Sequence, residues 1–143
     1  MSIDAIFQYS FLLNAPFWFL MIFAPFWNWT KRIISSPWIA APAALLYTFL
    51  VLPQLGDIFT FVLNPDLAGM VEYLSSPQGT TIAWVHFLVG DIFVGRWAYL
   101  DAREKNISVW LMAVVLLVIL LFGPLGLLLY LVVRELHARF IRE

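Results

Sequence analysis

Apolar residues fill most of this chain, and charged residues gather in short gaps between long apolar runs. Three runs of more than 20 residues contain no charged residue, namely 5–30, 33–56 and 108–133. A helix needs about 20 apolar residues to cross a lipid bilayer. A fourth segment is apolar apart from three ionisable side chains. The pattern therefore predicts four transmembrane helices, at about 5–29, 37–62, 80–101 and 108–134.

A shorter amphipathic segment lies between the second and third predicted helices. Asn64-Pro65 is a helix-start signal. Apolar residues then recur at helical spacing, at Leu67, Met70, Val71 and Leu74. This predicts a helix at about 65–75 that lies in the membrane interface. The expected fold is all-α and integral to the membrane: one domain, 1–143, forming a four-transmembrane-helix bundle with a short interfacial helix between helices 2 and 3.

Prolines interrupt three of the predicted elements. Pro16 in the first helix and Pro124 in the last each remove one hydrogen bond of the helix ladder, so both positions predict kinks. The second helix is expected to continue past Pro53 at an angle. Strands are excluded from the membrane, because an open sheet edge would leave backbone groups unpaired in lipid.

Composition makes lipid the expected surroundings of the chain. Its residues are 63% hydrophobic and only 12% charged, with a mean hydropathy of +0.90, so its own core cannot hide the apolar surface. The net charge of −1 and the lack of a basic run exclude a nucleic-acid partner. With no cysteine, disulfides, thiolate metal sites and cysteine nucleophiles are excluded.

The lysines and arginines predict an orientation. Five lie in or near the loops after helices 1 and 3, and three lie in the C-terminal tail. Because loops rich in Lys and Arg stay on the cytoplasmic side, both termini are predicted on the lumenal or periplasmic side of a thylakoid or bacterial inner membrane.

His86, Asp91 and Arg96 interrupt the third predicted helix and are the candidate chemical groups. An ionisable group at mid-bilayer costs roughly 2.5–3.5 kcal/mol, so each needs a partner, water or a ligand. At about 100° per residue the three do not form one stripe. Depth along the helices instead places Asn14 and Thr48 near His86 and Asp91, which predicts a polar cluster. The alternative is that these groups only tie the helices together through hydrogen bonds.

Aromatic residues offer a second candidate site. Trp18, Trp84, Phe93 and Trp97 lie near the polar residues or in the aromatic first helix, where rings could line a slot for a flat polyene. The alternative is that these rings simply face lipid. His86 alone is also a candidate ligand for the magnesium of a chlorophyll. No second histidine or carboxylate accompanies it at metal-ligand spacing, so no protein metal site is expected.

Two runs of sequence resemble a known family. A-W-V-H-F-L-V-G-D-I-F-V-G-R-W-A-Y-L-D-A-R-E-K-N-I, followed by L-F-G-P-L-G-L-L-L-Y-L-V-V-R, is similar to the ABA-deficient-four-like family of plastid and bacterial membrane proteins. These are associated in plants with the synthesis of neoxanthin. The similarity covers about residues 70 to 134. Asp101 and the Gly123-Pro124 pair, like His86, Asp91 and Arg96, fall where the family pattern places such residues.

The resemblance implies a function in xanthophyll metabolism. An epoxide would open to an allene by acid–base chemistry, with no redox cofactor and with a carotenoid as the bound pigment. His86 paired with Asp91 would transfer the protons, and Arg96 would stabilise oxyanion character or orient the end ring, with Asn14, Thr48 and Asp101 in support. The alternative class is a non-catalytic carotenoid- or chlorophyll-binding subunit of a larger photosynthetic membrane complex.

Overall fold

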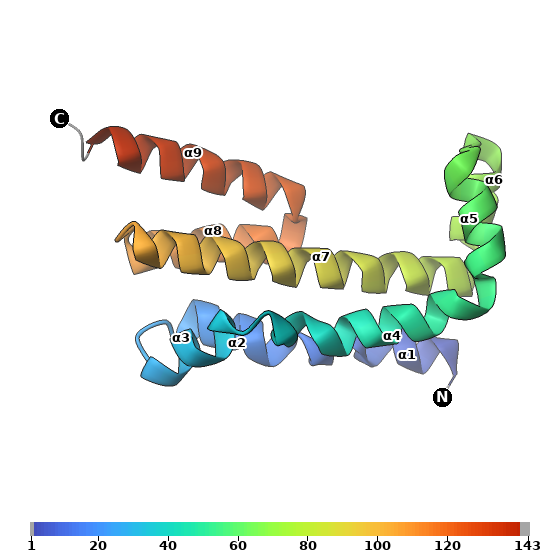
Figure 1. The fold of residues 1–143 in the computed structure, drawn as a ribbon, viewed down its shortest axis with the longest axis horizontal. Coiled ribbons are helices and arrows are strands. Elements are labelled where there is room, and N and C mark those ends of the chain that lie inside the picture. The colour runs from blue at the N-terminus through green and yellow to red at the C-terminus, as the bar shows by residue number, and fades with distance from the viewer. Residues whose placement is uncertain (1, 141–143) are drawn as a thin grey trace.

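The structure, a computed structural model, describes residues 2–140 of the chain. Every regular element in this range is helical (Figure 1). The elements are α1 (Ile3–Ser10), η1 (Phe11–Leu13), α2 (Ala15–Phe23), α3 (Asn28–Ser35), η2 (Pro37–Ala40), α4 (Ala41–Val51), η3 (Leu52–Gln54), α5 (Leu55–Leu63), α6 (Leu67–Ser75), α7 (Pro77–Glu104), α8 (Val109–Phe122) and α9 (Pro124–Phe140). The predicted all-α class is therefore confirmed.

α7 is the central helix of the molecule. Its 28 residues extend about 42 Å at 1.5 Å per residue. Ser76 begins it by accepting a hydrogen bond from the backbone N–H of Gly79, with Pro77 in the first turn. α1, α2, α4, α8 and α9 all pack against α7, and most of these helices run along the same long axis (Figure 1).

The first predicted helix breaks in the middle, as Pro16 predicts. A short 3-10 turn and Asn14 separate α1 from α2. The rod ends at Phe23, however, and does not reach residue 29 as predicted. Pro25 follows the end of α2, and the Thr30 hydroxyl donates to the carbonyl of Ala24, which turns the chain into the separate helix α3.

The second predicted helix changes direction at Pro53, as expected. The 3-10 turn η3 contains this proline, and α5 then continues at an angle across one end of the molecule (Figure 1). The predicted short helix at 65–75 is present as α6, which lies beside α5 at the same end. Its cap is Asp66, which accepts a hydrogen bond from the backbone N–H of Gly69, so the predicted start at Asn64 is two residues early.

The last predicted helix, 108–134, is wrong as a single element. α8 ends at Gly123, whose φ of +33° closes the helix, and Pro124 starts α9. α9 packs back on α8 and runs toward the end where α8 began (Figure 1). Gly126 lies so close to Ile119 that no side chain would fit there. Pro124 thus marks the tip of a helical hairpin and does not merely kink one helix.

This hairpin also changes where the chain ends lie. α1 begins at one end of the long axis and α9 finishes at the other (Figure 1). The prediction that both termini share one side is therefore not supported by the fold. It assumed that residues 108–134 cross the full length of the bundle.

Two helices are long and apolar enough to cross a membrane by length and composition, Ile3–Phe23 and Pro37–Thr60. α8 is apolar but shorter. Four continuous spans are therefore not confirmed within the described residues. The hairpin divides the last predicted span in two.

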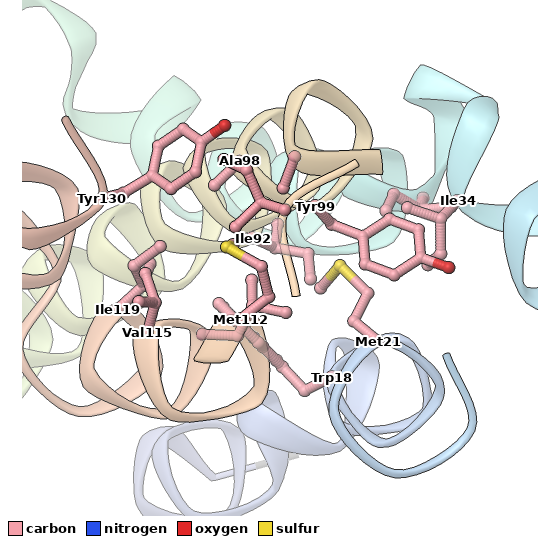
Figure 2. Packing of buried hydrophobic residues seen from close by; sticks show 14 of the residues in the cluster. Trp18, Met21, Ile34, Ile92, Ala98, Tyr99, Met112, Val115, Ile119 and Tyr130 are labelled. Atoms are coloured by element: carbon pink, nitrogen blue, oxygen red, sulfur yellow. The ribbon is translucent and has the colours of Figure 1, made fainter. Parts of the chain in front are cut away.

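The main core lies where α2, α7, α8 and α9 meet. Figure 2 shows Trp18 and Met21 of α2 facing Ile92, Ala98 and the α8 side chains of this cluster. Gly95 lets α2 approach, because a Cβ there would lie 2.4 Å from the Trp18 ring. A smaller core joins α4 to the first half of α7. The α8–α9 hairpin therefore covers the second half of α7, whereas α4 packs against its first half.

Candidate functional site

One face of α7 carries a row of residues three or four apart, which places them on one stripe of the helix. The stripe consists of Pro77, Thr80, Trp84, Leu88, Asp91 and Gly95. Its far end packs against α2, where Gly95 contacts Trp18. Its near end lines a groove, and Asp91 lies between the two parts.

The groove lies between α1 and the first half of α7 and has a volume of about 680 Å³. This is within the range of small-molecule pockets. Aromatic rings form its apolar wall, and the rings of Phe7 and Trp84 lie 5.6 Å apart. Carboxylate, amide and hydroxyl groups add polar positions. The lining residues are Asp4, Phe7, Gln8, Phe11, Ser75, Pro77, Thr80, Thr81 and Trp84.

Asp91 meets the tip of the α8–α9 hairpin. A Cβ on Gly123 would lie 2.5 Å from an oxygen of its carboxylate. Among residues 2–140 no hydrogen bond or ion pair reaches this carboxylate, although it is half-buried. It does lie beside the N-terminus of α9, where the helix dipole favours negative charge. Asp91 is two turns, about 10 Å, beyond Trp84 on the same face.

Asn14 lies in the break between α1 and α2 and is fully buried. Its side-chain N–H donates to the carbonyl of Leu88 at 2.7 Å, which ties the break to the stripe on α7. Within the described chain its Oδ1 has no hydrogen-bond partner. A buried acceptor without a partner is uncommon, and this one lies within a turn of Asp91 along α7.

His86 lies on another side of α7. Its ring is exposed and makes an edge contact with Tyr47 of α4, at 5.4 Å between ring centres. Thr48 is exposed too, and its hydroxyl donates to the carbonyl of Ala44 in its own helix. The predicted cluster of Asn14, Thr48, His86 and Asp91 is therefore not brought together, and neither is the predicted pair of His86 with Asp91.

Arg96 and Asp101 hold helices together. The Arg96 guanidinium donates to the carbonyls of Ile34, at 2.9 Å, and Ser35 at the end of α3. Such a contact satisfies carbonyls that have no partner within the helix. Asp101 accepts from Lys105 and, on α9, from Tyr130 and Arg134. Neither side chain lies with Asp91 in one reacting centre.

The four aromatic residues predicted to bind a ligand also lie in different parts of the fold. Trp84 lines the groove. Trp18 is 3% exposed and belongs to the core. Phe93 is 53% exposed on the outside of α7, and Trp97 contacts Tyr130 edge-on at 5.2 Å between ring centres. Only one of the four therefore lies where a ligand of the groove would touch it.

The groove residues of α1 were not predicted as a site, yet the sequence carries a signal for them. Asp4, Phe7, Phe11, Asn14 and Trp18 recur at steps of three and four residues, as do the stripe residues of α7. α1 and α7 run in the same direction, with Phe7 beside Trp84 and Asn14 beside Leu88. In the described part of the chain, no three His, Asp or Glu side chains gather as a metal site would require.

These features define a class: a small all-helical protein with helices apolar enough for a membrane, a broken first helix, and an aromatic groove that leads along one face of α7 to a half-buried carboxylate. The family model described as ABA DEFICIENT 4-like matches residues 5–130, and the chain belongs to this family.

A curated relative is "Protein ABA DEFICIENT 4, chloroplastic" from Arabidopsis thaliana, 29% identical over 99 residues. The match covers 65% of this chain and 45% of the relative, so the chain spans less than half of that protein's length. No solved structure matches.

Proposed function

We propose that the protein is an integral membrane protein of carotenoid metabolism that isomerises the epoxide end group of a xanthophyll to an allene. The observation that carries the proposal is the aromatic groove between α1 and α7, with the Asp91 carboxylate further along the same face of α7. This carboxylate has no hydrogen-bond or ion-pair partner among residues 2–140. Family membership supports it, and the relative named above is chloroplastic.

A lipid bilayer is the proposed surrounding, in a thylakoid or a bacterial inner membrane. Two helices have the length and hydropathy of a membrane span. Large apolar side chains are also exposed along the outer faces, among them Leu45, Phe49, Phe59, Trp110 and Leu121. Apolar surface on this scale is unusual for a monomer in water, and lipid would cover it.

The proposed reaction moves one proton within the substrate. A proton is delivered to the epoxide oxygen as its C–O bond opens, and a proton leaves the neighbouring chain carbon as the allene forms. The product is an isomer of the substrate, so no oxidant or reductant is consumed. A carboxyl group has both a donor O–H and an acceptor oxygen, so Asp91 gives one proton and receives the other. His86 and Arg96 have no role in this proposed mechanism, since both contact other elements.

The test is expression in a host that makes violaxanthin, with pigments separated by chromatography. We expect an allenic product with the wild-type chain, its loss with Asp91→Asn, and its retention with His86→Ala. Asp57→Asn is the matched control, because Asp57 is exposed on α5 and outside the groove. Equal accumulation of each variant in the membrane shows that folding is intact. Unchanged product with Asp91→Asn would remove the catalytic assignment.

A second candidate is a non-catalytic pigment-binding subunit of a photosynthetic membrane complex. The observation that favours it is the use of Arg96 and Asp101 in contacts between helices, together with the exposed ring of His86. Purification in mild detergent separates the two functions. Retained pigment or large partners without turnover would favour the subunit, and chlorophyll absorbance lost with His86→Ala would place a chlorophyll at that ring.

A further inference from the structure

Charge is distributed unevenly along the long axis of the molecule. The described basic residues lie on α3, on the second half of α7 and its following turn, and on α9; they are Lys31, Arg32, Arg96, Arg103, Lys105, Arg134 and Arg139. These elements share one end of the fold (Figure 1). α1, α5 and α6, which lie at the other end, carry Asp4, Asp57, Asp66 and Glu72 and no described Lys or Arg.

This asymmetry predicts an orientation for a membrane-embedded chain. Short segments rich in Lys and Arg stay on the cytoplasmic side, or the corresponding stromal side in a plastid. The end that holds α3 and the last turns of α7 and α9 would face that side. The groove, which lies at the acidic end between α1 and the start of α7, would face the periplasm or lumen.

The hairpin decides which half of α7 stays open. α8 and α9 enter from the basic end and turn back at Gly123, against Asp91 in the middle of α7. They cover the second half of α7 and leave its first half, with Trp84 and Thr80, to the groove. A lipid would therefore reach the groove sideways within one leaflet only.

The lining of the groove selects among lipids by charge. Among the described residues that line the groove, Asp4 is the one charged side chain and none is Lys or Arg. A phosphate headgroup would face this carboxylate with no cation to pair with it. A neutral end group with hydroxyl or ether oxygens would instead find the Gln8 amide as a hydrogen-bond donor. The hydroxyls of Ser75, Thr80 and Thr81 already donate to helix carbonyls, so their oxygens would accept from a hydroxyl of the ligand. The Phe7 and Trp84 rings would form an apolar wall.

We infer that the groove takes a neutral, oxygenated polyene lipid from the periplasmic or lumenal leaflet and excludes anionic phospholipids. The inference rests on the proposed function for the polyene, and on charge and geometry for the leaflet. The groove receives the oxygenated end ring near the membrane surface, and this ring passes along the stripe of α7 until its epoxide reaches Asp91.

The absence of cysteine makes the leaflet testable with single-cysteine variants of the full chain. Ser75→Cys places a thiol at the groove, and Ser108→Cys places one at the opposite end, where that exposed side chain makes no capping hydrogen bond. In intact cells with a permeabilised outer membrane, a membrane-impermeant maleimide should label Ser75→Cys at once. Ser108→Cys should be labelled only after lysis. The reverse pattern, or equal labelling of both, would overturn the leaflet assignment.

The lipid class is tested on the purified Ser75→Cys protein in phosphatidylcholine vesicles. Added violaxanthin should slow maleimide labelling several-fold, and replacing part of the lipid by phosphatidylglycerol should not. Protection by phosphatidylglycerol, or none by violaxanthin, would overturn the ligand class. Violaxanthin protection in a protein that yields no allenic product would sink the proposed isomerase and leave the groove inference standing. Labelling of Ser75→Cys from the cytoplasmic side would overturn the groove inference and leave the proposed isomerase standing.

Discussion

At the scale of single residues, the close approach of Gly123 to Asp91 predicts that no side chain is tolerated at position 123. Gly123 has φ +33°, and a Cβ there would lie 2.5 Å from the Asp91 carboxylate. A residue other than glycine in such a sparsely populated backbone conformation costs about 1–3 kcal/mol, and the close approach to Asp91 adds to this. Gly123→Ala should therefore lower the midpoint of thermal unfolding in detergent clearly.

Gly90→Ala is the matched control on α7. Nothing lies within 4 Å of a Cβ at Gly90, so this substitution should stabilise the helix by about 0.5–1 kcal/mol. An equal loss of stability in both variants would mean that the effect of Gly123→Ala does not come from the close approach to Asp91. A neutral Gly123→Ala would contradict the hairpin tip as described.

Trp84 provides the residue-scale prediction for binding. Its ring packs on Phe7 in the wall of the groove, and an aromatic contact between this ring and a bound polyene would contribute about 0.5–1.5 kcal/mol. Trp84→Ala should weaken xanthophyll binding roughly two- to tenfold, measured by quenching of the remaining tryptophan fluorescence. Trp110→Ala should bind as the wild type does, because Trp110 is exposed on α8 and contacts Phe26 instead.

The sequence identified which residues were costly to bury but not what would compensate them. Burial cost singled out His86, Asp91 and Arg96, and depth along the helices added Asn14; of these, His86 is exposed. The partner of Asn14 is the backbone carbonyl of Leu88, and those of Arg96 are the carbonyls at the end of α3. A pattern of side chains does not reveal such acceptors, so the predicted side-chain cluster does not form. Two of its four members, Asn14 and Asp91, lie close to each other along α7.

At the scale of elements, the helix positions were largely predictable and the last reversal was not. Prolines correctly marked the break before α2 and the turn at η3. The sequence predicts a kink at Pro124, because a proline within an apolar run removes one hydrogen bond of the helix ladder. The Gly123-Pro124 pair also fits a helix end followed by a helix start, with glycine after the last turn and proline in the first turn of the next. The apolar pattern is equal on both sides, so only packing separates the two interpretations.

Asp101 of α7 holds α9, the second helix of this hairpin, in place through hydrogen bonds. Its carboxylate accepts from Arg134 at 2.8 Å and from the Tyr130 hydroxyl, both on α9. Asp101→Asn removes the charge that holds Arg134, so α9 should exchange backbone hydrogens several-fold faster while α2 does not change. Arg139→Gln is the control, because its bond to Glu135 is exposed and stays within α9. Equal exchange in both variants would show that Asp101 does not anchor α9.

At the scale of the whole molecule, the hairpin changes the charge balance that sets orientation. Treating residues 108–134 as one crossing places Arg134 and Arg139 opposite Lys31 and Arg103. In the structure the four lie at one end (Figure 1). The single crossing puts five Lys and Arg residues on one side of the membrane and three on the other, whereas in the structure all the described ones lie toward one end. By the positive-inside rule, the end that holds the last turns of α9 faces the cytoplasm and the N-terminal end faces the periplasm or lumen.

Reporter fusions test this arrangement on the whole chain. A periplasm-active phosphatase should be active when fused ahead of residue 1 and inactive when fused after residue 143, with a cytoplasm-active fluorescent reporter giving the converse. A fusion after residue 105 should match the C-terminal one, because α8 and α9 leave and return to the same end. A fusion after residue 75 should match the N-terminal one. If the fusions after residues 105 and 143 report opposite sides, residues 108–134 cross the membrane once and the hairpin is not the membrane form of the protein.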